Sequence, residues 1–229
     1  MKTAIVTGAS GNMGQAVVKK FIDEGYRVIG TVLSDDFAKL DFAANRFEKV
    51  VVDLMNEENA QKFATAAIAK YGAIDTAVLT VGGFAKGNIA DTRTAAISKQ
   101  IQLNFETAYN IARPVFMQMM KQGIGRIFLI GSKPGLAARE GKGLVAYSLA
   151  KSLIFRLAEL MNQEAKGSNV VTSVVVPSTI DTPQNRQSMP DAEFSSWVTP
   201  EAVAAAVYFY SSDAAAVLRE PVIKVYNNA

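Results

Sequence analysis

The chain has 229 residues, of which 49% are hydrophobic and 20% are charged, and its formal net charge is +3. This length and composition can support a full hydrophobic core, which excludes a disordered chain, and no stretch concentrates lysine and arginine as a nucleic-acid surface requires. The sequence contains no cysteine and no histidine, which excludes disulfides, thiolate or histidine catalysis and the common zinc sites. We therefore expect no metal, and any proton transfer must use Tyr, Lys, Asp, Glu or a cofactor.

Short β-branched runs alternate with longer helical patterns from one end of the chain to the other. Apolar residues spaced by three and four predict helices, among them 13–21, 63–71 and 149–160. The predicted strands are 3–7, 27–32, 49–53, 76–80, 126–130, 170–176 and 222–225. They are almost continuously apolar, which is typical of a parallel sheet covered on both faces. The sequence predicts an α/β fold in which residues 1–229 form one domain, a doubly wound parallel sheet of the Rossmann type with about seven strands.

A glycine-rich turn follows the first predicted strand and reads Thr-Gly-Ala-Ser-Gly-Asn-Met-Gly. Gly8 lets the chain turn off the strand, Gly11 and Asn12 can adopt positive φ, and Gly14 allows close helix packing. The following helix N-terminus offers N–H groups to a pyrophosphate. A plain tight loop is the alternative, but the position in the first βα unit favours a dinucleotide site. The expected contacts are Gly8, Ser10, Gly11, Asn12, Met13 and Gly14.

Tyr147 and Lys151 are candidates for acid/base catalysis. They are four residues apart on a predicted helix and therefore share one face. An ammonium one turn away stabilises a phenolate and lowers the tyrosine pKa from its usual ~10. Such a pair alone can be an exposed helix feature, but in a chain without histidine it is a plausible acid/base device. Ser132 follows the fifth predicted strand, at the edge of a parallel sheet where ligands bind, although a loop or cap hydroxyl is the alternative.

These motifs resemble the short-chain dehydrogenase/reductase family. Tyr147-Ser148-Leu149-Ala150-Lys151 carries the match, together with Ser132 and with Asn104 inside the predicted fourth helix. The family's turn, Thr-Gly-x-x-x-Gly-x-Gly, has a glycine where this chain has Asn12, and the spacing of Gly8, Gly11 and Gly14 resembles the extended branch. The resemblance implies that Ser132 binds the substrate oxygen, Tyr147 is the acid/base, Lys151 holds the nicotinamide ribose, and Asn104 bends its helix and anchors a water that connects to Lys151.

The same resemblance implies further cofactor contacts. Asp53 and Leu54 end the third predicted strand, where the family binds adenine, although Asp53 could instead cap the helix that begins near Asn56. Gly82 lies where the family's Asn-Asn-Ala-Gly approaches the cofactor. The segment after the sixth strand matches the part that contacts the nicotinamide carboxamide, with Ser178 in place of a glycine. The remaining expected contacts are Tyr147, Lys151, Pro177, Thr179, Ile180 and Thr182.

The implied function is hydride transfer between NAD(P) and a small carbonyl or alcohol substrate. Residues 181–197 resemble quinonoid dihydropteridine reductases, so a pterin reductase is the alternative, and this segment could form a lid. A nucleotide-sensing regulator is disfavoured by the Tyr–Lys pair, and a sugar-nucleotide epimerase by the short C-terminal segment. The second strand ends near Val32 and Leu33 without a carboxylate, which favours NADP over NAD, whereas Asp35 or Asp36 would favour NAD.

The sequence also carries expectations about partners and location. No window reaches the ~18 apolar residues of a membrane span, and the N-terminus does not have the pattern of a signal peptide. We expect a cytoplasmic protein with a small-molecule substrate and no membrane or nucleic-acid partner. The family resemblance implies a homodimer or homotetramer through the helices that carry Asn104 and Tyr147.

Overall fold

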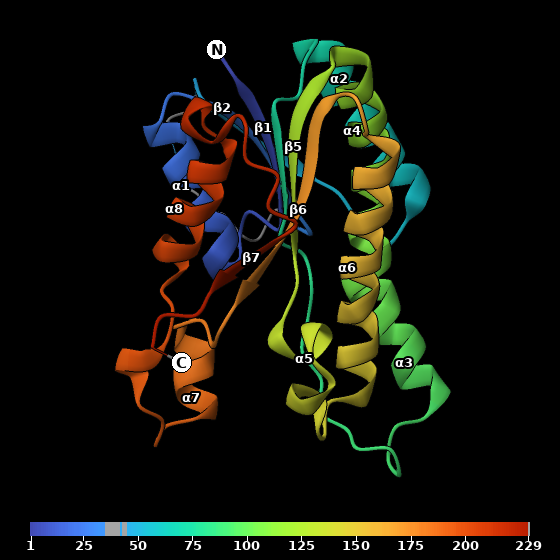
Figure 1. Cartoon of the computed structure of the whole chain (residues 1–229), viewed down its shortest axis with the longest axis vertical. Coiled ribbons are helices and arrows are strands. Elements are labelled where there is room, and N and C mark those ends of the chain that lie inside the picture. Colours follow the sequence, from blue (N-terminus) through green and yellow to red (C-terminus); the bar gives the residue numbers. More distant parts are fainter. Residues whose placement is uncertain (35–41, 43–44, 229) are drawn as a thin grey trace.

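A seven-stranded parallel sheet forms the centre of the structure, a computed structural model that describes residues 1–34, 42 and 45–228 (Figure 1). The strand order is β3-β2-β1-β4-β5-β6-β7. The direction of winding reverses between β1 and β4, and the crevice outside the carboxyl ends of the strands at such a switch point is where ligands bind. The strands are β1 (Thr3–Thr7), β2 (Arg27–Val32), β3 (Phe47–Val51), β4 (Thr76–Leu79), β5 (Ile124–Ile130), β6 (Asn169–Pro177) and β7 (Val222–Val225).

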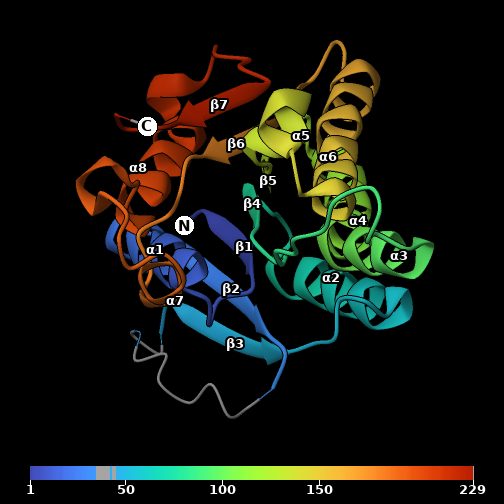
Figure 2. The ribbon, with the colours of Figure 1, turned by 90° about the horizontal axis from the view of Figure 1, so that it is seen from below.

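Helices cover both faces of the sheet, which confirms the predicted fold class. Helices α1 and α8 lie on one face, and α2, α4 and α6 lie on the other (Figure 2). None of the helices in the described part of the chain has the length and hydrophobicity that a membrane span requires. The helices are α1 (Asn12–Asp23), α2 (Glu57–Tyr71), α3 (Thr94–Ile101), α4 (Thr107–Gln122), α5 (Lys133–Leu136), α6 (Val145–Glu164), α7 (Pro183–Ser188) and α8 (Pro200–Ser211).

The central strands supply two hydrophobic cores, one on each face. Successive side chains of a strand point to opposite faces, so Ile5 joins the core under α2, α4 and α6 while Val6 joins the core under α1 and α8. The same alternation places Leu129 in the first core and Phe128 in the second. Burial on both sides explains why these strands are apolar at almost every position.

Four predicted strands have other bounds in the structure, and two of them are only longer than predicted: the fifth is Ile124–Ile130 instead of 126–130, and the sixth is Asn169–Pro177 instead of 170–176. The third strand is Phe47–Val51 instead of 49–53, because its ladder with β2 runs from Phe47 opposite Val28 to Val51 opposite Val32. The fourth strand ends one residue before Thr80, whose hydroxyl donates to the Thr7 carbonyl at 2.6 Å. The third and fourth strands therefore end where side-chain hydrogen bonds or pairing partners change. Apolar periodicity does not show such changes.

Candidate active site

The glycine-rich turn brings helix α1 against the end of β1. Gly8 has φ 63°, and its carbonyl accepts a hydrogen bond from the Gly11 N–H at 3.0 Å. A Cβ at Gly14 would lie 2.1 Å from the Gly8 oxygen, so only glycine permits this approach. The expectation of positive φ at Gly11 and Asn12 is wrong: Gly11 has φ −74° as the N-cap, Asn12 is the first residue of α1, and the positive φ falls at Gly8 because the chain reverses there.

The turn forms one wall of a pocket of about 320 Å³. Neither a side-chain cap nor an acidic residue occupies the first turn of α1, so its N–H groups are available to an anion. The end of β4 and the segment after β6 form the other walls. The arrangement fits the phosphates of a dinucleotide. The lining residues are Gly8, Ser10, Gly11, Asn12, Met13, Gly14, Thr80, Val81, Gly82, Ile180 and Thr182.

Thr80 and Val81 were not among the expected contacts, although both follow β4, beside the switch point between β1 and β4. Asp53, Leu54, Pro177 and Thr179 are absent from the described lining of this pocket, and their contacts with a cofactor stay a prediction.

Asp53, Leu54 and Thr179 make hydrogen bonds within the chain. The exposed Asp53 carboxylate accepts from the Met55 N–H at 2.9 Å, and Asn56 instead caps α2. The Leu54 carbonyl accepts from Asn110 Nδ2 at 2.9 Å, and that of Thr179 accepts from the Val198 N–H. Asp35 and Asp36 lie outside the described residues.

Ser132 and Lys151 meet at the carboxyl end of β5. Ser132 is the N-cap of α5, and its Oγ accepts from the Gly135 N–H at 3.1 Å. Lys151 is only 5% exposed, and its Nζ donates to the Ile130 carbonyl at 2.8 Å. A Cβ at Gly135 would lie 2.6 Å from Lys151 Cβ, so glycine is required for α5 to pack on α6. Short α5 thus fixes the Ser132 hydroxyl beside the helix that carries Tyr147.

Asn104 lies on the other side of the lysine. It occupies a π-helix, Gln102–Glu106, between α3 and α4, and not the regular helix that was predicted. Its Oδ1 accepts from the Gly83 N–H at 3.1 Å, and its Nδ2 donates to the Gly83 carbonyl at 3.0 Å and to Gln100 Oε1 at 3.0 Å. A Cβ at Gly82 would lie 2.7 Å from Asn104 Oδ1 and 3.3 Å from Lys151 Nζ, so the glycine separates the two side chains.

Comparison with known proteins bears on this arrangement. Residues 2–193 match the short chain dehydrogenase family. The chain belongs to this family. It is 31% identical over 189 residues to an acetoacetyl-CoA reductase of Acinetobacter sp. (strain RA3849), covering 80% of this chain and 75% of the relative. It is 25% identical over 228 residues to the 3-oxoacyl-(acyl-carrier-protein) reductase FabG of Vibrio cholerae, covering 95% and 92%.

The fold of this short-chain dehydrogenase also matches a solved structure, that of ElxO with NADP bound. The TM-score is 0.89 at 21% identity, and the match covers 98% of this chain and 96% of that chain. Family and relatives together confirm an NAD(P)-dependent oxidoreductase that acts on carbonyl or alcohol groups. Within the described residues no group of three or more acidic side chains is placed to hold a metal ion.

Burial is the largest cause of the pKa shifts of Tyr147 and Lys151, which both lie on α6. It raises the pKa of Tyr147, and a hydrogen bond with the Ser132 side chain opposes the rise. Lys151 was expected to lower the pKa of Tyr147; the lowering contribution comes from Ser132 instead, and burial outweighs it. Burial also lowers the pKa of Lys151 from 10.5 to about 8. The Phe84 ring contributes to the surroundings of Tyr147, edge-on with centroids 5.2 Å apart.

We expect Lys151→Met to stabilise this dehydrogenase near neutral pH while weakening its activity. The fall from 10.5 to about 8 corresponds to about 3 kcal/mol against the charged form in the folded state. Between these two values the unfolded chain binds the proton and the folded chain does not, so the stability of the wild-type protein rises with pH across this window. The Lys151→Met protein should not show this rise in stability with pH. Urea unfolding at a series of pH values measures the stability of both proteins and its pH dependence, and steady-state rates measure the activity.

Exposed Lys142 on the preceding loop is the matched control. Its replacement by Met should change stability by less than about 0.5 kcal/mol and leave the pH dependence in place. A Lys151→Met protein that is less stable than wild type at neutral pH, with an unaltered pH dependence, would contradict burial as the cause of the lowered pKa.

Proposed function

We propose that this chain reduces a ketone to an alcohol with NADPH, using Tyr147 as the proton donor. The observation that carries the proposal is the buried Lys151, which lies at the end of β5 beside Ser132 and one helix turn from Tyr147, next to the phosphate pocket. A bound nicotinamide cofactor supplies the hydride. Gly82 connects the two parts of the site, because it lines the pocket and also lies against Lys151.

Each side chain then has one task. Ser132 donates a hydrogen bond to the carbonyl oxygen and orients it. Tyr147 transfers its phenolic proton to that oxygen as the C=O π bond breaks and a C–H and an O–H bond form. Lys151, buried one helix turn from Tyr147, would hold the nicotinamide ribose of a bound cofactor, and solvent returns the proton to the phenolate. Asn104 fixes the chain at Gly83 and thereby the position of Gly82.

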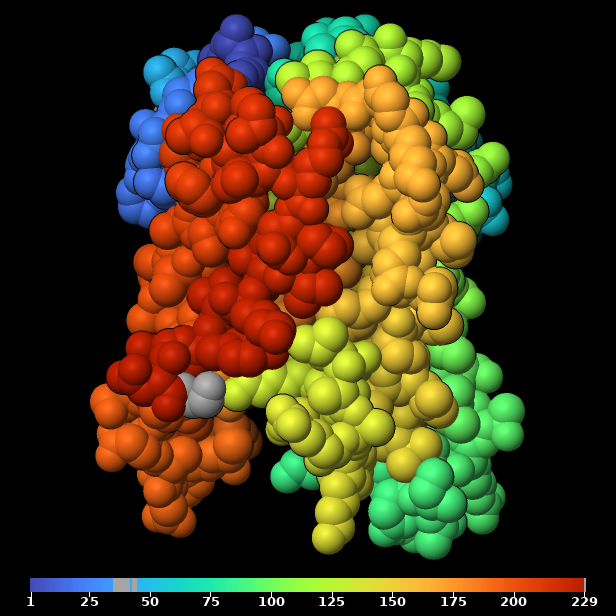
Figure 3. Space-filling model, in the orientation of Figure 1, coloured from blue at the N-terminus to red at the C-terminus, as the bar shows by residue number. Residues whose placement is uncertain are grey.

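The names of the relatives support 3-oxoacyl thioesters as the first substrate class to test, since one is an acetoacetyl-CoA reductase and another a 3-oxoacyl-(acyl-carrier-protein) reductase. The space for a substrate lies at the carboxyl end of the sheet. Figure 3 shows the surface hollowed there, between the orange segment that carries α7 and the yellow-green segment that carries α5. Phe84, 60% exposed beside Tyr147, offers apolar contact at this place.

A homodimer or homotetramer also belongs to the proposal. Its support is the exposure of large apolar side chains on the two helices that the family resemblance implicates. These residues are Tyr109 and Met117 on α4 and Leu149 and Leu160 on α6.

We expect NADPH to bind more tightly than NADH and to be oxidised in the presence of 3-oxoacyl thioesters or small ketones. The physical reason is at the end of β2, where Val32 and exposed Leu33 offer no carboxylate to repel a 2′-phosphate. The fold of ElxO holds NADP in a structure with the same architecture. Fluorescence titration with both cofactors measures the preference, and loss of reduced-cofactor absorbance measures the reaction.

The two parts of this expectation can fail separately. Tighter binding of NADH would overturn the choice of NADPH and leave the reductase intact. An absence of ketone-dependent oxidation with either cofactor, in a protein that binds one of them, would overturn carbonyl reduction itself.

A further inference from the structure

The segment that carries α7 is a loop whose two ends are joined. The Asp181 N–H donates to the Val198 carbonyl at 2.8 Å, and the Val198 N–H donates to the Thr179 carbonyl at 2.9 Å. Ile180 and Val198 form an isolated parallel bridge at the same place. The base of the loop is therefore fixed, and any movement of α7 takes place about it.

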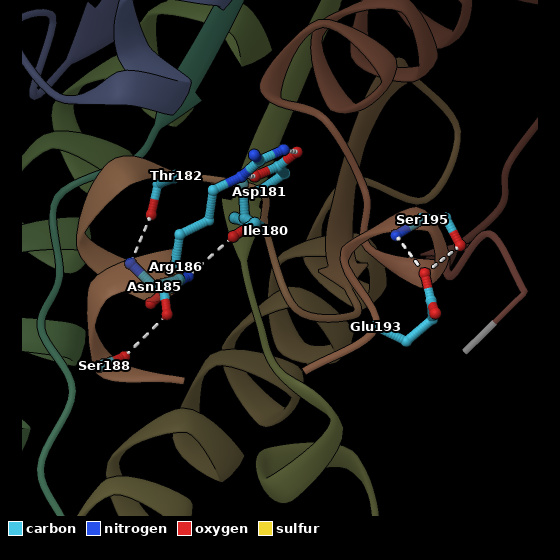
Figure 4. Close-up of polar contacts among 8 residues, drawn as sticks. All are labelled: Ile180, Asp181, Thr182, Asn185, Arg186, Ser188, Glu193 and Ser195. Carbon is cyan, nitrogen blue, oxygen red and sulfur yellow. Dashed lines mark hydrogen bonds and ion pairs between the residues drawn. The ribbon is translucent and has the colours of Figure 1, made fainter. Parts of the chain in front are cut away.

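Helix α7 is held together by contacts within its own loop (Figure 4). Arg186 makes a bidentate ion pair with Asp181, with N–O distances of 2.6 and 2.7 Å. Asn185 Nδ2 donates to the Ile180 carbonyl at 2.8 Å, and the Thr182 hydroxyl caps the helix. The helix buries none of its own residues against the sheet. It is a preformed unit that rests on the surface and is not packed into the core.

One side-chain contact ties this unit to the phosphate pocket. Asn12 Nδ2 donates to Gln184 Oε1 at 3.0 Å, and in the described part of the chain this is the hydrogen bond that joins an α7 side chain to a residue outside the loop. Asn12 lines the phosphate pocket and also a larger hollow of about 830 Å³ between α1, α7 and the start of α8. The bond therefore lies between the phosphate pocket and a space that is open to solvent.

We propose that Asn12 and Gln184 form a clasp that holds α7 at the edge of the phosphate pocket, and that opening of this clasp controls release of the cofactor. The proposal rests on the proposed function, because it takes the pocket to be the cofactor site. Thr182, the N-cap of α7, lines the same pocket, so a displacement of α7 opens that part of its wall. A glycine at position 12, as in the pattern Thr-Gly-x-x-x-Gly-x-Gly, would have no side chain to reach Gln184.

Removal of the acceptor tests the clasp. Gln184→Ala should raise the dissociation rate of the tighter-binding reduced cofactor about three- to tenfold, because a hydrogen bond of this kind contributes about 1 kcal/mol. Trypsin should also cleave faster after Arg186, with or without cofactor. The matched control is Gln187→Ala, which makes the same change at an exposed glutamine of the same helix and should alter neither rate. Asn12→Ala combined with Gln184→Ala should do no more than either single change.

A covalent link gives a second test that does not depend on the strength of one hydrogen bond. The chain contains no cysteine, so a protein carrying Asn12→Cys and Gln184→Cys can be joined by a short bismaleimide at these positions alone. Linked with the cofactor bound, it should retain the cofactor through gel filtration that strips the unlinked protein.

The outcomes separate the clasp from the proposed function. A wild-type protein that binds neither NADPH nor NADH would overturn the proposed function, while the cleavage rates would still report whether the clasp holds α7. A cofactor that binds, but leaves the Gln184→Ala protein and the linked protein at the wild-type rate, would overturn the clasp.

Discussion

Replacing Tyr147 with phenylalanine should lower kcat by about 10²- to 10⁴-fold, the range that a positioned acid or base contributes. The change deletes one hydroxyl. It removes the proton that the substrate oxygen receives, but it keeps the ring and its edge-on contact with Phe84. Thermal unfolding and cofactor titration should therefore be close to wild type. Steady-state rates with the best substrate of the carbonyl panel give the measurement.

The pH profile adds a readout that a purely structural role would not move. Reduction needs the protonated phenol, and burial raises the pKa of Tyr147 in the structure. The wild-type rate of reduction should stay high through neutral pH and fall as pH rises through that raised pKa. In the Phe variant this alkaline limb should be absent from the residual rate.

A control and a contrary result are available on the same chain. Tyr109 is an exposed tyrosine on α4, and its replacement by phenylalanine deletes the same group away from the site. That variant should keep the wild-type kcat. Near-normal turnover in the Tyr147→Phe protein would remove Tyr147 from the mechanism.

The sheet could be predicted from the sequence because strands that are buried on both faces are apolar at almost every position. Strand β1 is buried at all five positions, and its apolar run is visible without any knowledge of its neighbours. The spacing of Tyr147 and Lys151 likewise follows from helix geometry alone. The local contact of Asp53 was not predicted: its carboxylate accepts from the Met55 N–H in an Asx-type arrangement.

Other features of the site depend on contacts that have no signal in the local sequence. The π-helix around Asn104 is accompanied by hydrogen bonds to Gly83, a residue 21 positions away in the chain. Periodicity indicates which face Lys151 occupies, but not that the side chain is 95% buried, and this burial sets its pKa. The organisation of residues 1–229 as a single domain stays a prediction.

Ser132 offers the test that separates a carbonyl reductase from a pterin reductase. If Ser132 donates a hydrogen bond to the developing oxyanion, Ser132→Ala should lower the rate of ketone reduction by about 10²- to 10³-fold. The dihydropteridine reductases that residues 181–197 resemble lack this serine, so a pterin-reducing site should lose little. Turnover of a ketone and of quinonoid dihydropterin by the same two proteins distinguishes the two activities.

The structure shows which side effect must be controlled. Ser132 also caps α5 through the Gly135 N–H, and loss of an N-cap costs about 1 kcal/mol. Ser132→Thr keeps a hydroxyl for both tasks and should restore most of the ketone activity, whereas a rate loss caused only by a frayed α5 would affect both substrates alike. We expect the ketone rate to collapse in the Ala variant, because Ser132 is held beside Tyr147 by a packed helix. Pterin turnover that is faster than ketone turnover and survives in the Ala variant would assign the site to pterins instead.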